Sequence, residues 1–231
     1  MRSILLFISF LAIYSQAQDS DSLTLLNGKY VIGNNASEKD GYLHIDVKDK
    51  NGTIVNEEYE LERVFSVSTV GEEKVYYQMD ELQGNYLTVE EARFTTWGSR
   101  DARVTSNPIG VFVSSIAIGY AASLYDTYFS QKDYDLLATG YTTPPDLNVG
   151  FFGSSPSVFQ LMIPTTLTLV WTIPSFKVKK KKVLYLPGYG NDFYYRGYNR
   201  IAKQKRMFAA LGGSLIGTGL GLISYGIFKI N

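Results

Sequence analysis

The sequence has no cysteine and a single histidine, His44. The absence of cysteine excludes a disulfide framework, a thiolate nucleophile and sulfur ligation of a metal. His44 lies on the polar face of a predicted strand, and catalysis or metal binding would need further oriented groups beside it. We therefore predict no catalytic residue, no metal site and no cofactor, and we interpret the chain as a non-enzyme.

Phosphate- and calcium-binding signatures are also missing. The glycine clusters at residues 188–190 and 217–221 match neither the G-x-x-x-x-G-K-[ST] loop nor the dinucleotide fingerprint. Acidic pairs such as Glu57-Glu58 and Glu90-Glu91 lack the spacing of a twelve-residue calcium loop. We interpret these pairs as solvated surface charge.

Charged residues are scarce, at 19% of the chain against about 25% in typical soluble domains. The chain also contains 21 glycine, 18 tyrosine and 13 phenylalanine residues, and this composition favours a protein that contacts a membrane. The formal net charge of zero hides a segregation of sign, because acids prevail over residues 19–103 and bases over residues 177–206. The two parts of the chain are therefore expected to face different surroundings.

The first residues have the pattern of an export signal. Arg2 precedes an apolar run over residues 4–14, and Ser15-Gln16-Ala17 supplies the small residues that a signal peptidase reads. We predict a signal peptide over residues 1–17 with cleavage after Ala17; the alternative is an uncleaved N-terminal anchor.

Short apolar-polar alternations follow the signal. Asn27-Gly28 between two such runs predicts a two-residue type I′ hairpin, and Asn51-Gly52 predicts a second turn. Residues 42–48 alternate strictly, as in a half-buried strand. We predict an α+β chain that begins with a small β domain over residues 18–80, a meander or an SH3/Sm-like barrel.

An amphipathic helix with its linker is predicted over residues 84–103. Thr88 and Glu91 have the spacing of a capping box, and Leu87 and Ala92 have that of a hydrophobic staple. Gly98 is expected to bend or end this helix, because glycine is costly in a helix interior.

Several short motifs resemble a loose group of uncharacterised exported bacterial membrane proteins. The motifs are Leu26-Asn27-Gly28, residues 63–67, 84–93 and 98–102, and Tyr195-Arg196-Gly197-Tyr198 followed by Ala202 and Lys205-Arg206. The resemblance implies an architecture, an N-terminal L-x-N-G β unit with a glycine-rich C-terminal helix, and no particular activity.

Three uncharged windows, residues 104–125, 147–176 and 207–228, are long enough to span a bilayer. We predict that residues 104–231 form a membrane-associated region of two to three helices. Proline at 164 and 174 is expected to kink the second window. The first window contains small residues, among them Ser115 and Gly119, and either crosses the membrane or packs without crossing.

Glycine recurs every four residues in the third window. We predict that these residues form a helix-packing seam in a glycine zipper, called the glycine stripe below: Gly213, Gly217 and Gly221. The alternative is a buried hairpin of a soluble protein, where each glycine would cost about 1 kcal/mol relative to alanine.

The basic stretch between the last two windows is predicted to contact anionic lipid headgroups rather than RNA, because aromatic residues beside it suit a membrane interface. The predicted headgroup contacts are Lys177, Lys179, Lys180, Lys181, Lys182, Arg200, Lys203, Lys205 and Arg206.

The sequence gives two conflicting signals about the orientation of the protein in the membrane. The excess of bases favours a cytoplasmic location for residues 177–206, whereas the signal would export the β domain. Three full crossings would place the basic stretch on the same side as the β domain. We expect that the first window does not cross; a misread signal or an outer-membrane location are the alternatives.

These observations predict a protein of the bacterial cell-envelope membrane with a periplasmic N-terminal domain. The expected function is that of a non-enzymatic adaptor or assembly component, with membrane lipid and either itself or another membrane protein as partners, and no nucleic acid. The alternative is a small oligomeric transport or pore component. Against it, the three windows contain no ionisable residue of the kind that marks ion routes.

Overall fold

The computed structural model describes residues 20–69, 71–140, 158–173, 178, 183–184 and 186–229. The chain divides into two units. The β unit comprises Met1–Arg100 and Pro187–Gly197, and the helical unit comprises Asp101–Leu186 and Tyr198–Asn231. The predicted signal peptide lies outside the described residues.

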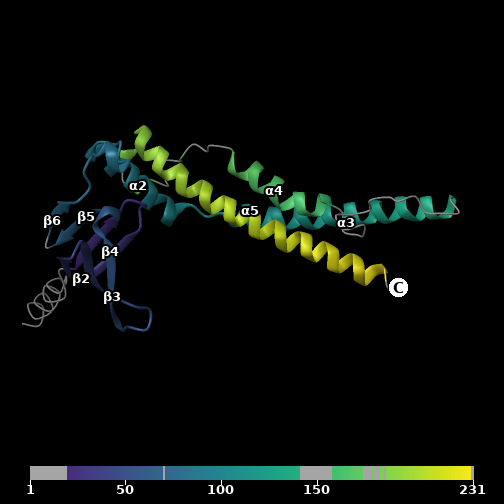
Figure 1. Cartoon of the computed structure of the whole chain (residues 1–231), viewed down its shortest axis with the longest axis horizontal. Coiled ribbons are helices and arrows are strands. Elements are labelled where there is room, and N and C mark those ends of the chain that lie inside the picture. Colours follow the sequence, from purple (N-terminus) through teal and green to yellow (C-terminus); the bar gives the residue numbers. More distant parts are fainter. Residues whose placement is uncertain are drawn as a thin grey trace, which may run out of the picture. The chain divides into compact units, whose positions relative to one another are not determined.

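The β unit contains one six-stranded antiparallel sheet in the order β4-β3-β2-β1-β5-β6 (Figure 1). The strands are β1 Asp21–Leu25, β2 Tyr30–Lys39, β3 Tyr42–Lys48, β4 Ile54–Glu60, β5 Val64–Thr69 and β6 Glu72–Val75. With the helices that follow, this sheet confirms the α+β class. The SH3/Sm-like barrel stays a prediction.

The hairpin between β1 and β2 differs from the predicted type I′ turn. Gly28 has a positive φ of 78°, but Asn27 is not among the described residues with positive φ. Asn27 Oδ1 instead accepts a hydrogen bond of 2.8 Å from the N–H of Lys29. The prediction was wrong because the loop is longer than two residues. The N–H of Gly28 donates to the carbonyl oxygen of Leu25, the N–H of Leu25 donates to that of Lys29, and such a loop needs one left-handed residue, which is Gly28.

The type I′ pattern occurs at the next hairpin. Asp40 and Gly41 both have positive φ, 52° and 82°, and lie between the paired residues Lys39 and Tyr42. Asp-Gly is a preferred sequence for this turn, so the signal was present in the sequence.

The core of the β unit gathers the inward-facing residues of β1, β2, β3 and β5. They are Leu23, Leu25, Val31, Leu43, Ile45, Val64 and Val67. A second cluster joins Phe65, Tyr77 and Ala92, with Leu87 packed against it. Burial of these side chains supplies the hydrophobic stabilisation that holds the first turn of the following helix on the sheet.

Helix α2, Val89–Thr105, begins as its sequence predicts. The N–H of Thr88 donates to Glu91 Oε2 at 2.8 Å, and the N–H of Glu91 donates to Thr88 Oγ1 at 3.3 Å, which confirms the capping box. The helix does not end at Gly98, since it continues to Thr105. Its cap and its buried face outweigh the cost of one glycine, about 1 kcal/mol.

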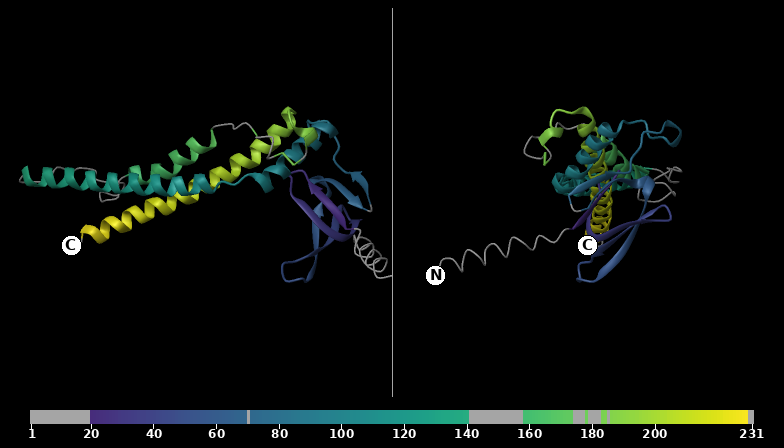
Figure 2. Two further views of the ribbon diagram at one scale, coloured as in Figure 1. Left: turned by 180° about the vertical axis from the view of Figure 1, so that it is seen from behind. Right: turned by 90° about the vertical axis from the view of Figure 1, so that its left-hand side faces the viewer.

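The helical unit contains three further helices: α3 Ile109–Gly140, α4 Val158–Thr172 and α5 Asp192–Lys229, the last of which begins in the β unit. Short 3-10 turns occur at η1 Leu61–Arg63, η2 Glu81–Gln83 and η4 Leu186–Gly188. Figure 2 shows α4 and the middle part of α5 beside α3, whereas the C-terminal end of α5 lies apart from α3.

In the part of the chain that the structure describes, two helices are long and apolar enough to cross a membrane, over Ile109–Tyr128 and Asp192–Ser224. These correspond to the first and third predicted windows. The described part of the second window is α4, which has 15 residues with Pro164 inside it. At 1.5 Å per residue it spans about 22 Å, less than the roughly 30 Å hydrocarbon core.

Candidate functional site

The glycine stripe of α5 lies directly against α3. A Cβ added to Gly213 would collide with the carbonyl oxygen of Phe112, and one added to Gly217 with that of Ile116. A Cβ on Gly221 would lie 2.8 Å from Ser123 Oγ. The contact made by these three residues is therefore within the chain, and it depends on the absence of side chains.

Small residues of α3 pack against the glycine stripe. Ser115 and Ser123 are fully buried, and a Cβ on Gly119 would lie 2.9 Å from the carbonyl oxygen of Ser214. Ser123 Oγ donates to the carbonyl oxygen of Thr218 at 3.1 Å. The i, i+4, i+8 spacing of positions 115, 119 and 123 places these residues on one face of α3. From the sequence, this spacing could have predicted that the face packs against the glycine stripe.

Helix directions follow from these contacts. Successive residues of the glycine stripe lie against successive turns of α3, so α3 and α5 are parallel. Helix α4 runs the opposite way, because Gln160 near its start contacts Thr127, and Lys203 Nζ is 3.5 Å from the carbonyl oxygen of Ile173 at its end. The segment that contains α4 therefore returns the chain to the end at which α3 began.

Gln160 connects α4 to α3 through a polar cluster that the sequence reasoning missed. Its Nε2 donates to the carbonyl oxygen of Ser123 at 3.1 Å, to Thr127 Oγ1 at 3.1 Å and to Asp126 Oδ2 at 2.9 Å. Only 3% of Gln160 is exposed. A glutamine in an otherwise apolar helix was the available signal.

Asp126 also corrects an expectation about the membrane windows. We expected no ionisable residue in them, but α3 continues past the end of the first window, and Asp126 lies within the candidate span Ile109–Tyr128. The first window was ended just before the first charged residue, Asp126. One charged residue does not end a helix, and α3 continues to Gly140.

The predicted headgroup residues divide into three sets. Lys177 and Lys179–Lys182 lie outside the described residues, while Arg200 is exposed and Lys203 half-buried. Lys205 Nζ donates to the carbonyl oxygens of Ala102, Arg103 and Ser106 at 3.2, 2.5 and 3.1 Å, and so caps the end of α2.

Arg206 is buried, and its Nε donates to the carbonyl oxygen of Ala202 at 3.2 Å. The side chains of Lys205 and Arg206 are thus engaged within the helical unit, and their contact with lipid headgroups stays a prediction. Sequence position beside an apolar window did not reveal that their donors face backbone carbonyls.

Polar side chains of the β unit form several hydrogen-bonded groups. In one of them, Asp46 of β3 accepts hydrogen bonds from Asn35 of β2 and Asn56 of β4, which lower the pKa of its carboxyl group. His44 Nδ1 lies 3.5 Å from Glu58 Oε1. Among the described residues, no group of three or more His, Cys, Asp or Glu side chains is placed to hold a metal ion.

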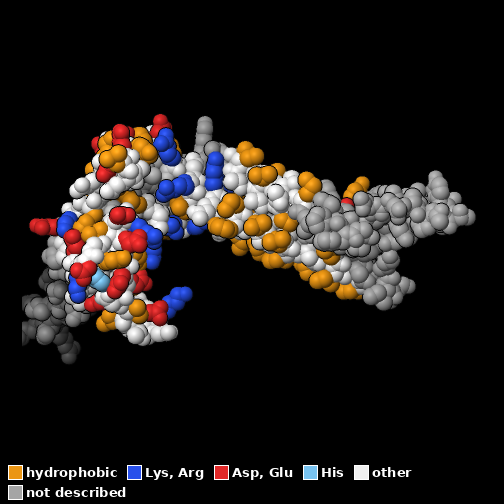
Figure 3. Space-filling model, in the orientation of Figure 1, with side chains coloured by type: hydrophobic (Ala, Val, Ile, Leu, Met, Phe, Trp, Pro, Cys, Tyr) orange, Lys and Arg blue, Asp and Glu red, His pale blue; other side chains and the backbone are white. Residues whose placement is uncertain are grey.

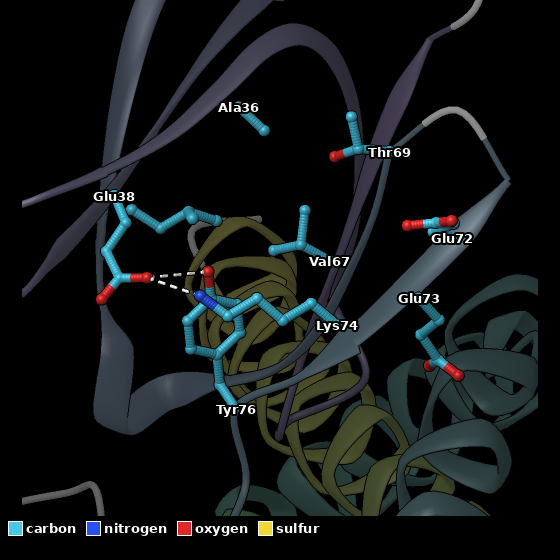
Figure 4. Close-up of a pocket in the computed structure, with 9 residues that line it drawn as sticks. Ala36, Glu38, Val67, Thr69, Glu72, Glu73, Lys74 and Tyr76 are labelled. Carbon is cyan, nitrogen blue, oxygen red and sulfur yellow. Dashed lines mark hydrogen bonds and ion pairs between the residues drawn. The ribbon is translucent and has the colours of Figure 1, made fainter.

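A second group lines a hollow of about 670 Å³ (Figure 4). Glu38 Oε2 accepts hydrogen bonds from Lys74 Nζ at 2.9 Å and from Tyr76 Oη at 3.0 Å across it. These bonds, that from Lys74 foremost, lower the pKa of Glu38, and the same carboxylate raises the pKa of Lys74.

Comparison with known proteins adds no family. No family model, curated protein or solved structure matches this chain. Any inference about its function therefore rests on its own residues and contacts.

Three of the short motifs noted in the sequence meet inside the β unit at Ser99. A Cβ on Gly28 would lie 2.5 Å from Ser99 Cβ, and Ser99 Oγ donates to the carbonyl oxygen of Gly197 at 3.2 Å. The Arg100 guanidinium lies 3.8 Å from the ring centroid of Tyr30. These motifs thus join the first hairpin, α2 and the start of α5 through close backbone packing, which is a structural role.

Proposed function

We propose that this chain is a non-enzymatic membrane protein of the bacterial cell envelope. In this proposal the helical unit lies in lipid, and the β unit makes protein contacts as an adaptor or assembly component. The supporting observation is the distribution of side chains in the helical unit, which is the inverse of that in a soluble helical bundle.

Large apolar side chains of the helices are exposed. Leu215 is 56% exposed and Ile223 61% exposed, and further exposed residues are Ile109, Val113, Ile118, Phe208, Ile216, Leu220 and Ile227. Figure 3 shows hydrophobic side chains along the helices, whereas Asp and Glu side chains gather on the β unit. In water such a surface would drive association, while in hydrocarbon it costs nothing.

Small polar side chains occupy the interior instead. Ser115, Ser123, Ser214, Thr127 and Gln160 are buried between the helices. A soluble bundle would bury its leucine and isoleucine residues and expose its serines. Close backbone contact and interhelical hydrogen bonds are the means by which helices associate in lipid, where the hydrophobic effect does not draw them together.

Membrane extraction tests this proposal. Membranes from cells that express the full chain should retain it after washes with alkaline carbonate and with concentrated salt, and release it into a mild detergent. Release by carbonate would show that the helical unit does not lie in lipid and would contradict the proposal.

The alternative function, a small oligomeric transport or pore component, has one observation in its favour. Asp126 and Gln160 form a polar pair between helices of the proposed membrane region, and ionisable residues in such positions often mark ion or proton routes. Proteoliposomes that contain the protein can be tested for a flux of ions or protons. A flux that the Asp126→Asn substitution abolishes would favour this alternative. Equal flux in the parent chain, in the variant and in empty liposomes would favour the adaptor.

A further inference from the structure

Two tripeptides of the β unit have the N-x-[ST] sequence that oligosaccharyltransferases modify at asparagine. They are Asn35-Ala36-Ser37 in β2 and Asn51-Gly52-Thr53 in the turn between β3 and β4. By sequence the two are equivalent, because neither has proline at its middle position. In the folded chain they differ as acceptors.

The first tripeptide is part of the sheet. Asn35 lies in the irregular part of β2 with a φ of 56°, and its Nδ2 donates to Asp46 Oδ2 at 3.0 Å. Ser37 is paired with His44 of β3. Because the amide nitrogen is the atom that receives the sugar, this site would require the bond to Asp46 and the strand pairing to break first.

The second tripeptide lies at the tip of the β3–β4 hairpin, which projects from the sheet (Figure 1). Residues 49–53 are all exposed. Two backbone bonds of 2.8 Å close the turn, from the N–H of Asp49 to the carbonyl oxygen of Thr53 and from the N–H of Gly52 to that of Asp49.

The acceptor amide of this turn is accessible. Among the described residues, no hydrogen bond holds the side chain of Asn51. A Cβ on Gly52 would meet no atom of the described residues within 4 Å, so a transferase and a glycan have room beside it. The exposed carboxylate of Asp49, two residues before Asn51, offers a further contact to a cationic group of the transferase.

The same hairpin exposes apolar side chains beside its tip. Strand β4 is an edge strand of the sheet, and its first two residues, Ile54 and Val55, are 68% and 46% exposed. An exposed apolar edge strand is a site at which another chain can pair and aggregate. A bulky, hydrated glycan three residues before Ile54 would shield this edge.

We propose that Asn51 carries an N-linked glycan. In the transfer, Asn51 Nδ2 forms a bond to the anomeric carbon of a lipid-linked oligosaccharide. The bond from that carbon to the lipid diphosphate breaks, the diphosphate leaves with the electron pair, and one amide proton passes to a base of the transferase. This inference rests on the proposed export of the β unit and adds a modification site to it.

Peptide masses test the proposal on the full chain. The protein is extracted in detergent from bacterial cells that contain an N-oligosaccharyltransferase and its lipid-linked oligosaccharide. The tryptic peptide that ends at Arg63 should be heavier by one glycan, and this increase should be lost in Asn51→Gln and in Thr53→Ala. Thr53→Ser, which keeps the hydroxyl group, and Asn35→Gln, the matched control at the other tripeptide, should retain it.

Two outcomes would overturn the inference: a parent chain without the glycan, or a glycan that is lost in Asn35→Gln instead of Asn51→Gln. A cysteine in the same unit, Asn191→Cys, then shows whether export failed. If an impermeant thiol reagent labels it once the outer envelope is permeable, the β unit is exported and only the glycan is contradicted. Protection of this cysteine contradicts the proposed export as well.

Discussion

At the scale of single residues, the glycines of α5 are not equivalent. Gly217 has a backbone carbonyl of α3 where its Cβ would be, but no atom of the described residues lies within 4 Å of a Cβ on Gly219. The same residue type therefore has a packing role at one position and open space two residues later.

Substitution by leucine should distinguish the packing position, Gly217, from the open position, Gly219. Gly217→Leu should lower the stability of the helical unit by about 2 kcal/mol or more, because the new side chain forces α5 away from α3. Gly219→Leu, the matched control, should change it little. Unfolding of both variants by SDS from mild-detergent micelles measures the difference. Equal stability of the two variants would exclude the glycine stripe as a packing seam.

The carboxyl group of Asp46 gives a prediction about pH. Hydrogen bonds from Asn35 and Asn56 lower its pKa in the folded chain, so they stabilise the fold above the ordinary aspartate value of about 3.9. That contribution is lost as the pH falls through the lower, folded pKa.

Removal of one donor should reverse part of this shift. In Asn56→Ala the pKa of Asp46 should rise toward its ordinary value, because one hydrogen bond to the charged form is lost. A pH titration of the Asp46 carboxyl carbon by NMR measures the pKa. Asn51→Ala in the neighbouring turn should leave it unchanged, and an unaltered pKa in Asn56→Ala would assign the shift to another cause.

At the scale of the elements, Gln160 makes the interhelical hydrogen bonds between α4 and α3 that the described residues show. The Oε1 atom of Gln160 has no hydrogen-bond partner among the described residues, while its Nε2 has three acceptors. Ile163 of the same helix is buried as well, so apolar contacts also hold α4.

Replacement of that glutamine should loosen α4. Gln160→Leu keeps the apolar character of the helix and removes the three bonds, so the helical unit should lose about 0.6 to 2 kcal/mol of stability, the range for interhelical bonds in membranes. Met162→Leu, at an exposed position of the same helix, is the control. A double-mutant cycle with Asp126→Asn measures how much of the loss belongs to the Asp126 contact. A loss no larger than that of the control would mean that α4 is held by other contacts.

At the scale of the whole molecule, the division into units bears on the proposed orientation. Residues 187–197 belong to the same compact unit as the sheet. The β unit and this part of the basic stretch therefore cannot lie on opposite sides of a membrane. The parallel helices α3 and α5 are joined by a returning segment, whose described helix α4 is shorter than the hydrocarbon core.

Single cysteines can test this arrangement cleanly, because the chain has none of its own. Asn51→Cys and Asn191→Cys should react alike with an impermeant thiol reagent, since both positions are in the β unit. If the β unit is periplasmic, as we propose, both should react once the outer envelope is permeable. Labelling of only one position would contradict the division into units, and protection of both would place the β unit in the cytoplasm.

The sequence predicted local features correctly where residues a few positions apart determine them. Thr88 and Glu91 cap α2 as predicted, because their bonds span three residues. The same kind of rule failed at Asn27-Gly28, where the loop is longer than two residues, and at Gly98, where the packing of a whole helix face outweighed the local preference.

The sequence by itself determined the α+β class and the long apolar helices, since these depend on periodicity and composition along the chain. It also marked the glycine stripe. Only the tertiary structure decided that the stripe faces α3, that Lys205 caps α2, and that residues 187–197 rejoin the β unit. The reason is physical: the spacing of residues in one element defines which face can make a contact, but the partner of that face lies up to a hundred residues away and is chosen by the packing of the folded chain.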